Sequence, residues 1–505
     1  MLQVYNRQSD AFVRDRESIS GEEAQRVDRA AFLVTIALFT LSYLIFCVSP
    51  IVNLSDSMYS LALSESILHD HSSHLNNYQF PEKIPSLERP VPLAAGPGPG
   101  FSAGLHSQLF WYSHDPSYER SYQLGNLNGN IVYLYPNGSS ILSLPFVAFM
   151  NATGTRVFVD HAYSHSNEIV IQKMIAALLM ALLTCLVFRM SLLMLPTAPS
   201  ATIAVGLAFG TQVWSTGTRA LWPQTWLIFL GGIAVYQILS VELGRSAQRP
   251  MLLATILSWM YFVRPTGAIP IACVTVYLLI CYRSDFITFA ITGTLWFWGF
   301  VEYSWLTFGQ LIPGYYRNRF DLSHFPSALY GSLFAASRGL FIYVPAIGFV
   351  VYLFVRYWRT MPLRRVALLA SAIALGNLIA IAAYPCWWGG YCYGARLMMD
   401  SLPWLVLLAI LGCSAAAAAR DSIFTRGEFG AAFSLLALSI AINARGAFSI
   451  PTQQWSTVVD VDKHPERVFD WSYPEFAAGL VSPPDYVIAN IHRLKQAASP
   501  GVSAK

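Results

Sequence analysis

Charged side chains stand beside the long apolar segments of this chain, where they could perform polar chemistry next to lipid. Asp56 follows the first such segment, residues 31–48. A carboxylate at this position could act as a general base that takes a proton from a hydroxyl group. It could also cap the helix predicted over 59–68, in which Leu and Ile interleave with Ser and Glu65 as in a helix lying along a membrane surface. The sequence leaves both roles open.

Three arginines are expected at one face of the membrane, each at the end of an apolar segment. Arg264 interrupts FVRPTGA, Arg338 stands in SRGLFIYVP, and Arg396 stands in YCYGARLMMD. Guanidinium groups bind phosphate oxygens in a bidentate manner, so together they could clamp a phosphate or a pyrophosphate. The alternative is an interfacial position for each arginine, or an i, i+4 pair between Arg396 and Asp400.

Aromatic and histidine side chains supply further candidates. Tyr59 is a candidate for contact with a substrate. Trp387 and Trp388 could form a platform for a sugar or part of an aromatic belt at the membrane interface. His69 and Asp70, in the run HDHSSH, are the candidates for a divalent metal, with a solvated loop as the alternative.

The seven cysteines follow no metal-binding spacing. Five of them lie in or beside apolar stretches, where a cysteine is usually a small hydrophobic core residue. Cys386 and Cys392 flank the turn WWGGY and could form a disulfide if that loop faces an oxidising compartment.

The amino-acid composition indicates a membrane protein. Of 505 residues, 55% are hydrophobic and 12% are charged, whereas soluble domains carry about a quarter charged residues. Mean hydropathy is +0.45. These values exclude a soluble enzyme, a disordered chain and a disulfide-stapled secreted module, and the net charge of +4 gives no reason to expect a nucleic-acid partner. We therefore expect an all-α polytopic membrane protein.

About eleven segments are apolar enough to be transmembrane helices. They cover residues 31–48, 167–188, 197–214, 221–241, 250–263, 265–282, 286–308, 339–355, 366–385, 401–419 and 429–447. Arginines are enriched in alternate loops, which predicts a cytoplasmic N-terminus and an extracytoplasmic tail in the inner or plasma membrane. Residues 139–150 are too few to cross and are expected to be re-entrant or interfacial.

This topology divides the chain into a cytoplasmic lead-in (1–30), a transmembrane domain (31–447) and an extracytoplasmic tail (448–505). The transmembrane domain includes a long first extracytoplasmic loop, 49–166. Asp56 and the three arginines are then all expected on the extracytoplasmic side.

Several segments in this order resemble those of bacterial membrane proteins of the GT-C superfamily. They are YLYPNGSSILSLPF, RALWPQTWLIFL, FVRPTGA, FGQLIPGYY, SRGLFIYVP, WWGGYCYGARLMMDSLP and ERVFDWSYPEF. The superfamily comprises polytopic glycosyltransferases that use polyprenyl-phosphate-linked sugars, including protein mannosyltransferase-like enzymes. The resemblance implies a GT-C-like fold, and Asp56 matches the acid of the first loop that serves there as base or metal neighbour.

One feature departs from the family pattern. Relatives often place a second acid beside the first, whereas Ser55 and Ser57 flank Asp56. The acids that could replace it from elsewhere in the loop are Glu65, Asp70, Asp115 and Asp160. Dependence on a divalent metal therefore stays open.

The expected function is transfer of a sugar from a polyprenyl-phosphate donor to an extracytoplasmic acceptor. Asp56 would take the acceptor proton, and the arginines would stabilise the leaving lipid phosphate. The donor and membrane lipid are the expected partners, and the class of acceptor is open. The alternatives are a lipid or glycan transporter (flippase) and a non-catalytic subunit of an envelope-assembly complex.

Overall fold

The computed structural model describes residues 21–82, 84–85, 122–317, 320–419 and 426–498. Each of the eleven predicted apolar segments overlaps a helix, because length and apolar composition are local properties of the chain. These helices are α2 (Gly21–Val48), α7 (His165–Ser191), α8 (Thr197–Gly210), α9 (Pro223–Glu242), α10 (Pro250–Val263), α11 (Ala268–Cys281), α12 (Arg283–Phe308), α14 (Leu340–Tyr343) with α15 (Ala346–Arg356), α16 (Arg364–Ala382), α17 (Leu402–Ala418) and α18 (Arg426–Phe448).

Six helices in the described part of the chain are long and apolar enough to cross a membrane, namely α2, α7, α9, α16, α18, and α17 taken together with the 3₁₀ helix η5 (Arg396–Ser401) that precedes it. Helices α8, α10, α11 and α15 are apolar but shorter. The chain therefore has the architecture of an all-α polytopic membrane protein. Helix α7 packs against α2, α8 and α9, and α17 packs against α9, α15 and α16.

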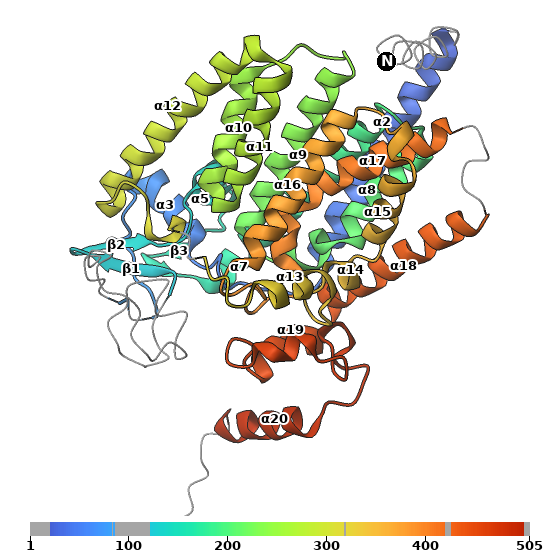
Figure 1. Cartoon of the computed structure of the whole chain (residues 1–505). Helices are drawn as coiled ribbons and strands as arrows, with labels where there is room; N and C mark the ends of the chain where they lie inside the picture. Colours follow the sequence, from blue (N-terminus) through green and yellow to red (C-terminus); the bar gives the residue numbers. More distant parts are fainter. Residues whose placement is uncertain (1–20, 83, 86–121, 318–319, 420–425, 499–505) are drawn as a thin grey trace, which may run out of the picture.

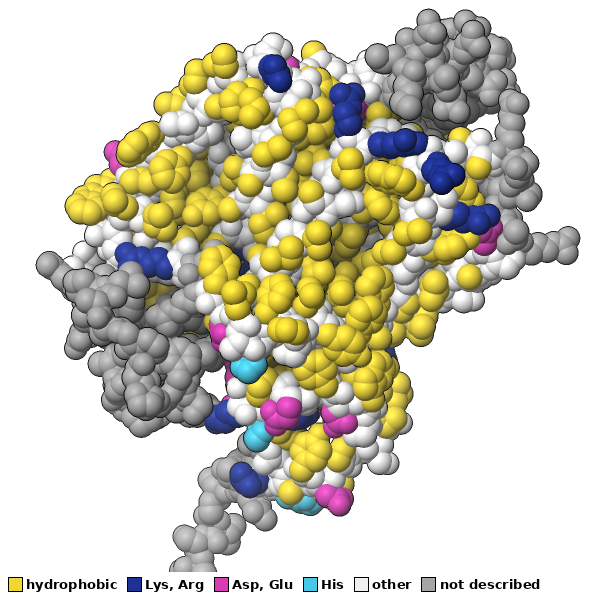
Figure 2. All heavy atoms as spheres, viewed as in Figure 1, with side chains coloured by type: hydrophobic (Ala, Val, Ile, Leu, Met, Phe, Trp, Pro, Cys, Tyr) yellow, Lys and Arg dark blue, Asp and Glu magenta, His cyan; other side chains and the backbone are white. Residues whose placement is uncertain are grey.

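The two ends of this helical body differ (Figure 1). Helix α2 begins at one end, and the tail helices α19 (Ile450–Val458) and α20 (Asp485–Ala498) lie beyond the other. Figure 2 shows hydrophobic side chains spread over the helices, with Lys and Arg in a row toward the end where α2 begins and acidic, basic and His side chains around the tail.

The first long loop contains two small antiparallel hairpins. Strands β1 (Leu124–Leu127) and β2 (Asn130–Tyr133) pair with Leu124 opposite Tyr133, and β3 (Phe158–Val159) pairs with β4 (Ala162–Tyr163). Asn128 and Gly129 form the first turn with φ of 53° and 90°, as a two-residue hairpin loop requires.

Residues 139–150 form two short helices, α5 (Gly138–Leu142) and α6 (Leu144–Ala152). Their five and nine residues are too few to cross a membrane, as predicted. The chain changes direction between them at Ser143, just before Pro145, which stands in the first turn of α6 where a proline costs no hydrogen bond.

The helix predicted over 59–68 is α3 (Ser60–Asp70), but the prediction that it lies along a membrane surface is wrong. Residues 60–66 are all buried, so α3 packs inside the protein instead of lying along a membrane surface. Its first turn is held by Glu168 of α7, whose carboxylate accepts hydrogen bonds from the backbone N–H groups of Tyr59 (3.0 Å) and Leu61 (3.2 Å).

The tail is packed onto the helical body. Trp455 and Val461 of the tail are buried in one hydrophobic cluster with Tyr343 and Ile381. Two 3₁₀ turns, η6 (Pro465–Phe469) and η7 (Glu475–Ala477), follow α19. The boundary expected at residue 448 therefore does not separate two independent hydrophobic cores.

Candidate functional site

Asp56 lies in the non-helical segment that leads from α2 to α3, and Arg219 fixes the start of that segment. The Arg219 side chain is 1% exposed. It donates hydrogen bonds to the carbonyl oxygens of Phe46 (2.8 Å) and Ser49 (2.9 Å), which satisfies groups that the end of α2 leaves free. The carbonyl oxygen of Arg219 accepts from Asn53 N–H (3.1 Å). A buried cation therefore holds the chain just before Asp56.

The Asp56 carboxylate forms an ion pair with Arg396. Arg396 Nη1 is 2.8 Å from Asp56 Oδ2, and the Tyr135 hydroxyl donates to Oδ1 (3.3 Å). The Tyr133 hydroxyl donates to the Asp56 carbonyl oxygen (3.1 Å). Asp56 is thus not the N-cap of α3, because Glu168 fills that role. Its side chain keeps 24% of its surface exposed.

Arg396 opens the 3₁₀ helix η5 (Arg396–Ser401) that precedes α17. Its guanidinium carbon lies 4.3 Å from the centre of the Trp222 ring, within the range of a cation–π contact. Its Nε is buried and has no hydrogen-bond partner among the described residues. The alternative pairing of Arg396 with Asp400 is wrong, because Asp400 pairs with a different arginine.

That arginine is Arg264, which lies between α10 and the 3₁₀ turn η2 (Pro265–Gly267). Arg264 Nε is 2.8 Å from Asp400 Oδ2, and the Thr266 hydroxyl donates to the same oxygen (2.7 Å). With its amide oxygen turned toward Arg264, Gln224 accepts from Nη1 (3.0 Å) and Nη2 (3.2 Å). The Asp400 side chain is 1% exposed, so this pair is the inner one.

Both ion pairs belong to one cluster, which we call the two-pair site: Asp56, Arg396, Arg264 and Asp400. Helix η5 supplies one member of each pair. Tyr315, in the 3₁₀ turn η3 (Gly314–Tyr316) that follows α12, packs its ring 5.0 Å from that of Tyr135. Burial raises the pKa of the Tyr315 phenol, and the charges of all four members act on it. Asp56 is the most exposed of the four side chains.

The tyrosines of the first loop that face this site are strongly desolvated. Burial raises the pKa of Tyr122, Tyr133 and Tyr135 well above 10, and the negative charge of Asp56 adds to the effect in each. The hydroxyls of Tyr133 and Tyr135, which both donate to Asp56, are therefore neutral at physiological pH.

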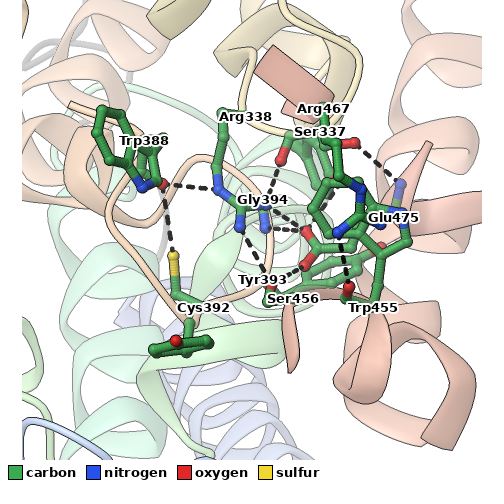
Figure 3. Close-up of polar contacts among 12 residues, drawn as sticks. Ser337, Arg338, Trp388, Cys392, Tyr393, Gly394, Trp455, Ser456, Arg467 and Glu475 are labelled. Atoms are coloured by element: carbon green, nitrogen blue, oxygen red, sulfur yellow. Dashed lines mark hydrogen bonds and ion pairs between the residues drawn. The ribbon is translucent and has the colours of Figure 1, made fainter. Parts of the chain in front are cut away.

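Arg338 does not join the two-pair site, and the expectation of three convergent arginines is corrected to two. Its side chain is 2% exposed and pairs with Glu475 of the tail at 2.7 Å. All five of its N–H groups have acceptors: the carbonyl oxygens of Ser337, Trp388 and Gly390, the Ser456 hydroxyl and the Glu475 carboxylate (Figure 3). No N–H group of Arg338 is left for a phosphate.

The aromatic candidates are held by the protein itself. Tyr59 is 1% exposed and packs against Phe80 and Tyr163. Trp387 is 8% exposed and contacts the Phe469 ring of the tail. Trp388 Nε1 donates to Asp462 (2.8 Å). Burial of Tyr59 and Trp387 leaves neither ring face open to a substrate.

The candidate metal ligands do not gather around an ion. His69 Nε2 lies 3.2 Å from Glu65 of the same helix, and Asp70 is exposed. Among the described residues no group of three His, Cys, Asp or Glu side chains could hold a metal. Of the other acids proposed to replace the second family carboxylate, Asp160 is exposed in the β3–β4 turn, and Asp115 lies outside the described residues.

Cys386 and Cys392 do not form the disulfide that the sequence allows, because both are free thiols. The Cys392 sulfur lies 4.0 Å from the Trp388 carbonyl oxygen.

Five of the seven segments quoted in the sequence analysis contribute to the two-pair site, while SRGLFIYVP and ERVFDWSYPEF meet at the separate Arg338–Glu475 pair. YLYPNG supplies Tyr135, ALWPQTW supplies Trp222 and Gln224, and PGYY supplies Tyr315 to the two-pair site. Composition and spacing gave no sign of these residues, nor of Asp400 as the partner of Arg264. The order of the quoted segments is the signal that could have found them.

No protein-family model matches this chain, and neither a curated protein nor a solved structure matches it.

Proposed function

We propose that the protein is a membrane glycosyltransferase of GT-C type that transfers a sugar from a polyprenyl-phosphate donor to an extracytoplasmic acceptor. The observation that carries the proposal is the two-pair site, where the partly exposed Asp56 and the guanidinium of Arg396 are in contact with Arg264 nearby. A carboxylate and two guanidinium groups are what removal of a hydroxyl proton and departure of a phosphate require.

The bonds and charges of the proposed step balance. The acceptor oxygen forms a bond to the anomeric carbon and gives its proton to Asp56. The bond between that carbon and the phosphate oxygen breaks, and the polyprenyl phosphate leaves with the electron pair. Arg396 and Arg264 stabilise the negative charge that it gains.

The ion pair between Asp56 and Arg396 affects how readily Asp56 can accept a proton. A carboxylate in contact with a guanidinium is a weaker base than a free one. A donor phosphate that binds Arg396 competes with Asp56 for the same N–H groups and so releases the carboxylate for proton transfer. Arg264 keeps Asp400 as its partner, because that carboxylate is buried and is also held by Thr266.

Transfer assays on the purified protein in lipid, with a panel of polyprenyl-phosphate sugars, test the proposal. We expect Asp56→Asn to lower the rate about 10²–10⁴-fold while donor binding is kept. The matched control is Asp160→Asn, an exposed acid of the same loop, which should transfer normally. Wild-type transfer by a folded Asp56→Asn protein would refute the assignment of the base.

We further propose eleven crossings, with the N-terminus in the cytoplasm and the tail outside, in the inner or plasma membrane. The support is that the first loop meets the loop after α16, through Asn53 Nδ2 and the Tyr391 carbonyl oxygen (3.2 Å), and meets the tail, through the Gln453 side chain and the Val52 carbonyl oxygen. Reporter fusions after residues 362 and 464 check it. Alkaline phosphatase should be active only in the fusion at 464, and the reverse pattern would refute the orientation.

A further inference from the structure

The tail residue Glu475 lies at the centre of a buried polar cluster (Figure 3). Its side chain is 1% exposed. Oε2 accepts from Arg338 Nη1 (2.7 Å), from the backbone N–H of Gly394 (2.9 Å) and from the Tyr343 hydroxyl (3.2 Å), and Oε1 accepts from Ser456 (3.1 Å). Four donors on one carboxylate compensate for its removal from water.

The segment that this cluster holds is the loop 383–395, between α16 and η5. Arg338 binds the carbonyl oxygens of Trp388 (2.7 Å) and Gly390 (3.2 Å), and Glu475 binds the N–H of Gly394. Gly389, Gly390 and Gly394 have φ of 77°, 66° and 61°. A loop with three glycines in the left-handed region has many alternative conformations, so external contacts must fix its path.

The loop leads directly into the two-pair site. Arg396 N–H donates to the Gly394 carbonyl oxygen (2.9 Å), and the side chain of Arg396 then reaches Asp56. Asp400 follows in the same 3₁₀ helix. A displacement at Gly394 therefore moves both the arginine that binds Asp56 and the acid that binds Arg264.

We infer that Glu475 is a positioning residue for Arg396. The tail then determines where one member of the two-pair site lies. The inference rests on the proposed function for its link to phosphate binding. Glu475 touches none of the four charged side chains of the site and acts through the backbone at Gly394, which stands 81 positions earlier in the sequence.

The test compares Glu475→Gln with Glu242→Gln in the full-length protein. Glu242 is a matched control because its side chain is 4% exposed, pairs with Arg365, and stands at the other end of α9 from Pro223. Two measurements are made on each: hydrogen–deuterium exchange of residues 386–400, and affinity for farnesyl phosphate, with farnesol as the probe without phosphate.

We expect Glu475→Gln to raise exchange over 386–400 and to weaken farnesyl phosphate binding about tenfold. In a protein that already carries Arg396→Gln, adding Glu475→Gln should weaken farnesyl phosphate binding less than about twofold, because Glu475 acts through Arg396. Glu242→Gln should leave both measurements unchanged. If Glu475→Gln does not fold, Ser456→Ala removes one donor to Glu475 and should give a smaller effect in the same direction.

Unchanged exchange over 386–400, or equal weakening with and without Arg396, would overturn the inference and leave Glu475 a residue of general stability. Failure of the wild-type protein to bind farnesyl phosphate is a different result. It would refute the proposed function, while raised exchange over 386–400 in Glu475→Gln alone would still support the positioning of Arg396.

Discussion

Asp56 and Arg396 stand 340 positions apart in the sequence, and their side chains form an ion pair of 2.8 Å. The second pair of the cluster, Arg264 with Asp400, has the same length but a different environment, since Asp400 is 1% exposed and Asp56 is 24% exposed. The inner pair is therefore suited to hold the site together, and the outer pair is suited to open for a ligand.

This difference predicts that two substitutions destabilise the protein to different extents. Asp400→Asn removes the charge of the more buried acid, whose side chain is 1% exposed, and takes the ion-pair partner from Arg264, so it should cost about 3–5 kcal/mol of unfolding free energy. Asp56→Asn should cost less, about 1.5–3 kcal/mol, yet abolish most transfer. Thermal melts and transfer assays on the two purified variants check both statements. A larger loss of stability in Asp56→Asn than in Asp400→Asn would contradict this division of roles.

Arg396→Lys keeps the charge but removes the planar fork that lies over Trp222. We expect it to lose about 1.5–3 kcal/mol of binding free energy for farnesyl phosphate, because a charged hydrogen bond is lost. Calorimetry measures the affinity. The control is Arg365→Lys, whose side chain is 68% exposed and should bind as the wild type does. Equal affinities of the two variants would show that Arg396 does not contact the phosphate.

Gly394 cannot accept a side chain. A Cβ there would lie 2.4 Å from Tyr343 Cδ1, and φ is +61°, so Gly394→Ala should cost about 2–4 kcal/mol of stability. Gly129 has φ of +90° with nothing within 4 Å of a Cβ, and Gly129→Ala should cost only about 1 kcal/mol. Melting temperatures of the two variants test the contrast, and similar shifts would mean that the loop 383–395 adapts.

The raised pKa of Tyr135 predicts that the folded protein becomes less stable at alkaline pH. Burial, with the charge of Asp56, raises its pKa in the folded protein well above 10, whereas the phenol of the unfolded chain ionises near 10. The folded state then binds more protons, so its stability falls as the pH rises past about 10. Between pH 9 and 11 the melting temperature should fall more steeply in the wild type than in Tyr135→Phe. Parallel curves would contradict the shift.

The helices were largely predictable from the sequence, and the candidate site was predictable only in part. Asp56, Arg264 and Arg396 were identified because charge at the end of an apolar segment is costly and conspicuous. Arg338 satisfied the same criterion, yet its partner is a tail acid that nothing near it in the sequence indicates. Tyr59 and Trp387 are amphipathic rings, which the sequence offers as candidates for substrate contact, but the burial of a ring depends on which segments pack over it.

The sequence by itself determined that the chain is helical and of membrane type, because apolar length and composition act locally. It did not determine which acid meets which arginine. Arg396 and Asp400 have the spacing of an α-helical pair, but η5 is a 3₁₀ helix, in which three residues complete a turn and positions i and i+4 no longer share a face. Glu168 at the start of α3, Asp56 at Arg396 and Glu475 at Gly394 are joined only when distant segments pack together. Tertiary structure decided these pairings, because an ion pair or a hydrogen bond depends on distance in space.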